Sequence, residues 1–333
     1  ARAWRDAWAD AFGGGTSVYY AGKAFLSVAV ARWVAEEGLR IDVATGGELA
    51  VALRAGVPGG DLALHGDNKS DAELVAARDA GVGRVVIDSL AEVDRVAAVA
   101  AEGWGGVAGR PAPVMLRVTT RGYAGRREQI FTPHEDQKIG PFVAGGQARA
   151  GLEAILARPS LELRGIHSHI GSQILDPAGF AVAARTVLAL RAELAGRTGV
   201  LVPEVDLGGG FGVAYLPQDV PLDPVRIAKD VATTVQEVCG ELGTAVPHVS
   251  VEPGRAIAGP STLTLYTVGT VKPVTTDGGL VRTYVSVDGG MSDNLRPALY
   301  GAGYHAALAS RVSTAPGVAC RVVGKHCESG DVV

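Results

Sequence analysis

The sequence has little of what marks secreted, membrane-bound or nucleic-acid-binding proteins. Its three cysteines are odd in number and widely spaced, which predicts neither a disulfide framework nor a zinc site, and we expect no metal. No apolar run reaches the roughly 18 residues that a membrane helix needs, and no signal peptide is recognisable. The net charge of −4 arises from interspersed acidic and basic residues, so no basic stripe suits nucleic acid or an anionic membrane. We therefore expect a cytoplasmic protein whose partner is a small molecule.

The length and composition suit a folded α/β protein. With 333 residues, of which 47% are hydrophobic, the chain can bury one large domain and part of another. It does not begin with Met, residue 1 already falls in an amphipathic helical pattern, and the final "SGDVV" enters a strand-like run. We therefore expect further segments of the protein beyond both ends of this sequence.

Short β-branched runs alternate with alanine- and leucine-rich helical stretches over the first 260 residues. The helical stretches, such as "FLSVAVARWVAEEG" and "KSDAELVAARDAG", mostly end in glycine, as helix C-termini prefer. Eight strand–helix repeats predict an α/β fold, a (β/α)8 TIM-type barrel over residues 1–260. A doubly wound open sheet is the alternative, because spacing does not reveal whether a sheet closes. The eight expected strands are residues 18–23, 41–44, 62–65, 85–88, 114–118, 163–169, 203–207 and 249–252.

The pattern changes near residue 261. "LTLYTVGTV" and "VRTYVSVDGG" are typical of consecutive strands joined by a "TTDGG" turn, which predicts the start of an incomplete β-rich domain over residues 261–333. Residues 119–140 are polar, glycine-rich and longer than a usual barrel loop, which predicts a flap over a site.

Unusual side chains follow the predicted strands at their C-terminal ends, where barrel enzymes place their active sites. Two glycine-rich loops, "GGGFG" after the seventh strand and "EPGR" after the eighth, offer backbone N–H groups that suit a phosphate. A lysine, an acid and a phosphate loop together predict pyridoxal 5′-phosphate. In this interpretation Lys23 bonds to the cofactor, Glu252 keeps its pyridine nitrogen protonated, and His169 lies against its ring. The polar strand-end residues are Lys23, Asp42, His65, Asp88, Arg117, His169 and Glu252.

Eight motifs in this order resemble those of the diaminopimelate decarboxylase family. They are "YAGKAF", "DVATGGEL", "HGDNKSDAEL", "HSHIGSQI", "DLGGGFG", "EPGR", "LRPALYGA" and "CESGD". The resemblance covers residues 18–331 and implies a barrel-type pyridoxal-phosphate enzyme related to ornithine decarboxylase and alanine racemase. It also implies decarboxylation of meso-2,6-diaminopimelate to L-lysine and CO2, the last step of lysine biosynthesis, by a homodimer with shared active sites.

The same resemblance implies roles for individual residues. Lys23 matches the Schiff-base lysine, and Cys327 matches a proton donor that a neighbouring subunit inserts into the site. We expect Asp42 to face the Schiff-base region, with a surface or capping role as the alternative. The family's first strand, and a last segment whose tyrosine touches cofactor and substrate, lie outside this sequence. The cofactor-binding positions are Lys23, Asp42, His169, Ser172, Gly208, Gly209, Gly210, Glu252, Gly254 and Arg255, and the substrate-binding positions are Arg255, Arg296, Tyr300 and Glu328.

The residues also bear on the substrate. Arg296 and Tyr300, four apart at a predicted helix start, present a cation and a hydroxyl on one face, which suits a distal carboxylate. Glu328 suits a distal amine. Ornithine, lysine or carboxynorspermidine decarboxylation is the alternative, although a distal arginine argues against substrates whose far end is only an amine. An amino-acid racemase would use a tyrosine base and lack "CESGD", a cofactor-storage protein would lack the β-rich tail, and an interaction protein would bind no cofactor.

Single residues also have ordinary structural interpretations. Lys23 could extend to solvent from a strand end, and Cys327 could be an inert buried thiol. His167 is interpreted as a packed strand neighbour of His169. His65, Asn68 and Lys69 either form a helix-entry turn or lie near the cofactor.

Overall fold

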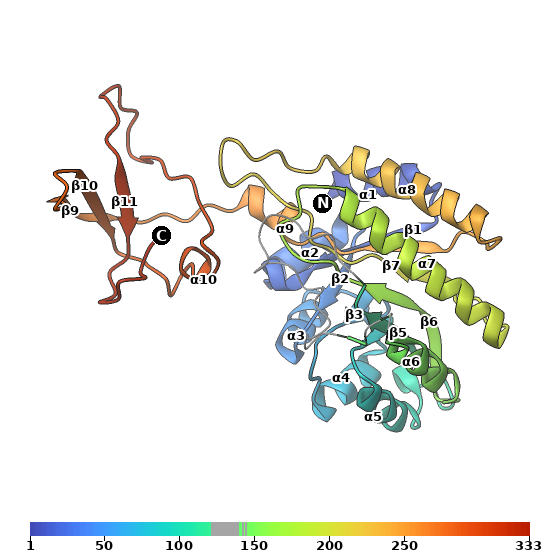
Figure 1. Ribbon diagram of the computed structural model, residues 1–333. Helices are drawn as coiled ribbons and strands as arrows, with labels where there is room; N and C mark the ends of the chain where they lie inside the picture. The colour runs from blue at the N-terminus through green and yellow to red at the C-terminus, as the bar shows by residue number, and fades with distance from the viewer. Residues whose placement is uncertain (121–139, 142, 144) are drawn as a thin grey trace. The chain divides into compact units, whose positions relative to one another are not determined.

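The computed structural model describes residues 1–120, 140, 141, 143 and 145–333, which form two compact units, residues 1–213 with 221–260 and residues 214–220 with 261–333. The first unit is a closed barrel of eight parallel strands, each paired with the next along the chain, and the eighth pairs with the first through Val18 and Val251 (Figure 1). The predicted (β/α)8 barrel is therefore confirmed, and the open sheet is excluded. The strands are β1 (Thr16–Ala21), β2 (Arg40–Val43), β3 (Leu62–Leu64), β4 (Arg84–Ile87), β5 (Ala112–Val118), β6 (Leu161–Ser168), β7 (Glu204–Asp206) and β8 (His248–Val251).

The helices begin where side chains can cap their free N–H groups. Ser70 and Glu73 form a reciprocal capping box on one helix, and Gly81 ends it in the left-handed region at φ 64°. The first helix packs against the last barrel helix, and its Trp4 ring lies 4.5 Å from the ring of Phe211. The helices are α1 (Arg2–Phe12), α2 (Val28–Glu36), α3 (Gly46–Arg54), α4 (Asp71–Ala80), α5 (Leu90–Ala100), α6 (Gln147–Leu156), α7 (Ala178–Thr198), α8 (Pro224–Glu241) and the short α9 (Arg255–Ala258).

Aliphatic strand residues fill the layer between the sheet and these helices, but the barrel interior also holds a buried charge. Arg84 begins β4, is 2% exposed, and pairs through its guanidinium with Glu204 and Asp206 of β7. The same guanidinium lies 3.8 Å from the centre of the Tyr19 ring. Two acidic partners and an aromatic face offset the cost of burying this cation.

The second unit contains a small mixed sheet of three strands, β9 (Val268–Thr275), β10 (Val281–Val287) and β11 (Cys320–Val323), and the short helix α10 (Arg296–Tyr300). The predicted hairpin is present, because β9 and β10 are antiparallel and the turn closes through Thr276. The expected strand at residues 263–271 is wrong in its start, since β9 begins at residue 268. Among the described residues, no helix combines the length and hydrophobicity needed to span a bilayer. Most of the expected flap, residues 121–139, lies outside the described part of the chain.

Candidate active site

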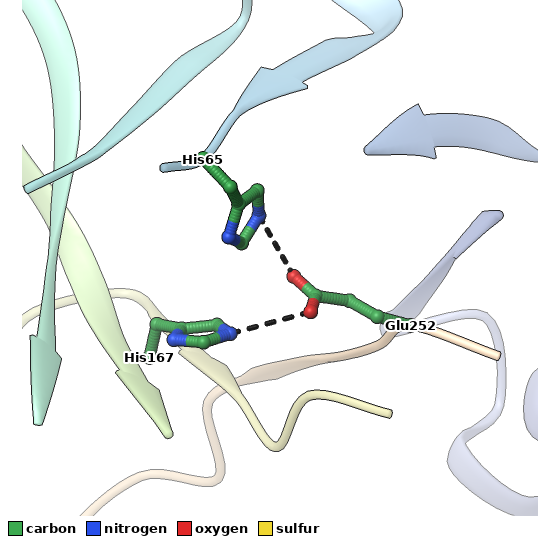
Figure 2. Close-up of side chains that lie close together, drawn as sticks. All are labelled: His65, His167 and Glu252. Atoms are coloured by element: carbon green, nitrogen blue, oxygen red, sulfur yellow. Dashed lines mark hydrogen bonds and ion pairs between the residues drawn. The ribbon is translucent and has the colours of Figure 1, made fainter. Parts of the chain in front are cut away.

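A buried carboxylate contacts two histidines at the C-terminal ends of the barrel strands. Glu252 directly follows β8 and is 3% exposed. Its Oε2 lies 3.3 Å from Nε2 of His167 on β6, and its Oε1 lies 3.0 Å from Nε2 of His65, which follows β3. Figure 2 shows both imidazole rings directing a nitrogen at this carboxylate. His167 is buried on β6 two residues before His169, as interpreted, and it also contacts Glu252, which the sequence did not predict. His65 lies at the same carboxylate, and its role near the cofactor stays a prediction.

These contacts determine where the charge lies. Burial opposes ionisation of Glu252, but His65 and His167 outweigh it and hold the pKa of the carboxyl well below its usual range. Burial lowers the pKa of His167 to about 3, so this imidazole is neutral at pH 7. The cluster is therefore a carboxylate that accepts a hydrogen bond from a neutral ring.

Lys23 lies two residues beyond the end of β1, in a single turn of 3-10 helix (Gly22–Ala24), and is exposed. Burial raises the pKa of Asp42 on β2, and the nearby charges of His65 and Lys23 partly offset this rise. Burial lowers the pKa of His169 well below its usual value, and the Lys23 ammonium lowers it further. The amine therefore lies within electrostatic range of both Asp42 and His169.

The glycine loop after β7 packs closely against the loops after β6 and β8. The N–H of Gly208 donates to Oδ1 of Asp206 at 2.7 Å, and the N–H of Gly209 donates to Nδ1 of His169 at 3.2 Å. A Cβ on Gly209 would lie 2.2 Å from the carbonyl oxygen of Glu252, and Gly210 has a φ of 102°. Only glycine permits this approach and this backbone conformation.

Two polar side chains join the loops on either side of the glycines. Nη2 of Arg255 donates to Oγ of Ser172 at 2.9 Å, which connects the loop after β8 to the loop after β6. A Cβ on Gly254 would lie 2.8 Å from Cβ of Ala21, so this loop also packs against the end of β1. A cation, a hydroxyl and glycine backbone are the groups that bind phosphate in barrel enzymes.

These residues fit pyridoxal phosphate. Lys23 offers an amine, and Glu252 offers Oε1, a buried oxygen without an aligned hydrogen bond in the described structure. The ligand atoms of His65, His167 and Glu252 lie within 4.8 Å of one another, a spacing that a metal ion would also accept. Each histidine nitrogen, however, faces its own carboxylate oxygen, as in a hydrogen-bonded cluster. That the site holds no metal stays a prediction.

The remaining candidates belong to the second unit. On α10 the guanidinium of Arg296 lies 5.4 Å from the centre of the Tyr300 ring, and its Nε donates to Oη of Tyr304 at 3.0 Å. Cys327 and Glu328 are exposed in the loop after β11.

That loop is held by a residue whose role the sequence reasoning missed. The buried carboxylate of Asp331 accepts the N–H of His326 at 2.7 Å and that of Met291 at 2.6 Å. The final letter of "CESGD" was the available signal, because an aspartate side chain in a loop can accept hydrogen bonds from neighbouring backbone N–H groups.

Lys69 makes buried contacts that the sequence did not reveal. It is 3% exposed, and its ammonium donates to the carbonyls of Gly66 and Val86 and to both oxygens of Glu92. Glu92 in turn accepts the N–H of Asp88. Lys69 therefore fastens the loop after β3 to β4 and α5, so the turn-forming interpretation of this residue fits the structure.

Comparison with known proteins agrees with this geometry. Residues 2–259 match the family model described as pyridoxal-dependent decarboxylase, pyridoxal binding domain. The barrel, the strand-end lysine and the glycine loops thus define a pyridoxal-dependent decarboxylase. The diaminopimelate decarboxylase of Mycobacterium tuberculosis is 52% identical over 329 residues, 98% of this chain and 72% of that protein. That of Bacillus subtilis is 40% identical over 316 residues, 95% of this chain and 70% of that protein.

Solved structures of the same class of enzyme also resemble this chain. The diaminopimelate decarboxylase of M. jannaschii in complex with L-lysine superimposes with a TM-score of 0.82 at 28% identity, over 99% of this chain and 74% of that one. The chain belongs to the diaminopimelate decarboxylase family.

Proposed function

We propose that the chain removes CO2 from the D-configured carbon of meso-2,6-diaminopimelate and releases L-lysine, with pyridoxal 5′-phosphate as its cofactor. The observation that carries this is the buried carboxylate of Glu252, whose Oε1 has no aligned hydrogen bond and which follows the strand next to β1. A barrel strand that leads to an amine and a neighbouring strand that leads to a buried acceptor are what this cofactor requires.

The cofactor, when bound, supplies a ring that accepts the electron pair left behind as CO2 departs. Lys23 supplies the amine that attaches the cofactor, with Asp42 beside it. Glu252 would hold the ring nitrogen and favour its protonated form, and His169 would hold the ring. The residues that would bind the phosphate are Ser172, Gly208, Gly209, Gly210, Gly254 and Arg255.

The distal end of the substrate determines specificity. Arg296 and Tyr300 bind its distal carboxylate, Glu328 binds its distal amine, and Arg255 completes the substrate contacts. The carbon–carboxylate bond breaks, and a proton must then reach the same carbon to form the new C–H bond. The thiol of Cys327 of the partner subunit delivers that proton and regains one from solvent.

The proton donor from a second subunit requires an assembly, which is part of the proposal. The chain acts in the cytoplasm as a homodimer with shared sites, without nucleic acid or membrane as a partner. Residues 1–260 form the cofactor-binding domain, and residues 261–333 begin a β-rich domain that carries the substrate residues.

The activity is tested by incubating the purified full-length protein with cofactor and meso-diaminopimelate. We expect CO2 and lysine in equal amounts, and no CO2 from ornithine or lysine. CO2 released from ornithine at a comparable kcat/KM would contradict the substrate, and inversion of the amino acid without CO2 would contradict the reaction.

The shared site is tested by mixing two inactive variants of the full-length protein, Lys23→Ala and Cys327→Ala, under conditions that exchange subunits. Half of the dimers are then hybrids with one complete site, so roughly a quarter of wild-type activity should return. If activity stays at the level of the separate variants while mass measurement confirms exchange, Cys327 does not act across an interface.

A further inference from the structure

The carboxylate of Glu252 depends on groups that take no direct part in the reaction. His167 is 1% exposed, and its Nδ1 is buried without a hydrogen-bond partner in the described structure. Its Nε2 faces Oε2, which can only accept. A neutral ring in this position therefore carries its single proton on Nε2 and donates it to Oε2.

The second oxygen has a different environment. Nε2 of His65 lies 3.0 Å from Oε1 of Glu252 and 3.8 Å from Oδ1 of Asp42, so it faces two acceptors and must itself carry a proton. The contact with Oε1 is close, but it is not aligned as a hydrogen bond. The two imidazole rings meet edge to face, with centres 5.0 Å apart and planes at 72°. Oε2 is therefore held, and Oε1 remains open to another donor.

Other charged groups surround the cluster from every neighbouring strand. Nη2 of Arg84 lies 3.7 Å from Oε1, and this cation persists because Glu204 and Asp206 pair with it. Burial raises the pKa of Asp206 well above its usual value, and the Arg84 guanidinium beside it partly offsets this rise. Glu204 pairs with Arg84, and Lys23 lies within electrostatic range of Asp42 and His169. The titratable and charged groups that face Glu252 or His167 are Asp42 (β2), His65 (after β3), Arg84 (β4), Arg117 (β5), His169 (after β6) and Asp206 (β7).

We propose that His167 and His65 are positioning residues for Glu252: His167 fixes Oε2 by donating from Nε2, His65 supports the carboxylate at Oε1, and together they keep Glu252 ionised with Oε1 available to the cofactor's ring nitrogen. This inference rests on the proposed function, which gives Glu252 that nitrogen as its partner. Without the donor on Oε2, the carboxylate would be free to rotate or to take up a proton in a site that burial makes unfavourable for charge. Either change would weaken its hold on a protonated ring.

The experiment compares His167→Leu, His167→Gln, Glu252→Gln and the control His248→Gln. Glutamine keeps an N–H donor near the position of Nε2, whereas leucine removes it. His248 begins the same strand, β8, at its far end, and pairs with Ser17 instead. Two readouts are independent of turnover: the dissociation constant of pyridoxal phosphate, and the visible absorption of the bound cofactor between pH 6 and 9. A third is the 15N NMR tautomer of His167 in the cofactor-free wild type, which needs no variant to fold.

The proposal predicts that His167→Leu weakens cofactor binding about 10- to 100-fold, the effect of losing a hydrogen bond to a charged group, and lowers the pH at which the cofactor absorption changes. Both should return largely to normal in His167→Gln and stay normal in His248→Gln. His167 should remain neutral, with its proton on Nε2, from pH 5 to 8.

Two results would overturn the inference, and they differ in what else fails. If Glu252→Gln changes both readouts while His167→Leu changes neither, or if His167 titrates near pH 6.5, the inference is wrong and the proposed function stands. If Glu252→Gln also leaves both readouts unchanged, Glu252 is not the partner of the ring nitrogen, and the proposed assignment fails together with the inference.

Discussion

Replacing Lys69 by methionine should destabilise the barrel more than any exposed lysine substitution could. Methionine keeps most of the aliphatic side chain, so the change removes the ammonium without opening a large cavity. In the native barrel that ammonium lies 2.7 Å from the Val86 carbonyl oxygen, 2.8 Å from that of Gly66, and 3.0 and 3.1 Å from the oxygens of Glu92. The substitution leaves all four acceptors without this donor.

The magnitude follows from burial. The side chains of Lys69 and Glu92 are 2% and 5% exposed, so the remaining carboxylate has little water to replace its partner. Removing one member of a buried ion pair costs about 3–5 kcal/mol of unfolding free energy. Changing both residues, Lys69→Met with Glu92→Gln, removes the stranded charge and keeps an oxygen for the N–H of Asp88. The double variant should therefore lose about 0.5–3 kcal/mol less than the sum of the two single variants.

The measurement is urea unfolding followed by far-UV circular dichroism. Lys229→Met, on the exposed face of α8, is the matched control and should shift the free energy of unfolding by less than about 0.5 kcal/mol. A loss below about 1 kcal/mol for Lys69→Met, close to the control, would refute the reasoning and return Lys69 to the candidates near the cofactor.

Three further changes test other parts of the account. Because the folded pKa of His167 is about 3 and the unfolded value is near 6.5, the unfolded chain binds more protons in that window, so stability falls as pH falls. Between pH 7 and pH 5 this histidine should lower the free energy of unfolding by about 2 kcal/mol. Urea unfolding of His167→Gln at the two pH values should not show this loss. Gly209→Ala should weaken cofactor binding at least tenfold because its Cβ meets the Glu252 carbonyl, whereas Gly240→Ala, with open space around it, should not; equal dissociation constants would contradict the packing. Asp331→Ala should speed hydrogen exchange in residues 324–330 about 10- to 100-fold, the effect of losing charged hydrogen bonds, and unchanged exchange would show that the loop is held otherwise.

The sequence predicted the fold well because the barrel is a repetition of local signals. Most strands are short apolar or β-branched runs, and several helices end at or just before a glycine, so the eight expected strands agree with the structure to within a few residues. The number of repeats predicted a closed barrel, but spacing alone left an open sheet as the alternative, since closure depends on the pairing of Val18 with Val251, which are distant in sequence. The start of β9 was placed too early because "LTLYTV" has strand propensity but no partner strand beside it.

The candidate site was predicted by residue type more than by contact. Strand ends of a barrel converge, so Lys23, Asp42, His169 and Glu252 could be grouped without a structure. The charged groups around these residues could not be predicted. Arg84, at the start of a strand, looks like a surface residue in the sequence, and only barrel closure brings Asp206 to it. The role of His167 could not be predicted for the same reason, because its partner Glu252 lies 85 residues further along the chain.

The central claim is that Lys23 attaches the cofactor at the mouth of the barrel. The most direct test is to load the chain with pyridoxal phosphate, reduce it with borohydride, digest it and locate the modified peptide by mass spectrometry. The account predicts one labelled lysine, in "YAGKAF", and no label in Lys23→Ala, whose fold should be intact because this side chain is exposed. A label on Lys69, or an undiminished label in Lys23→Ala, would contradict the account.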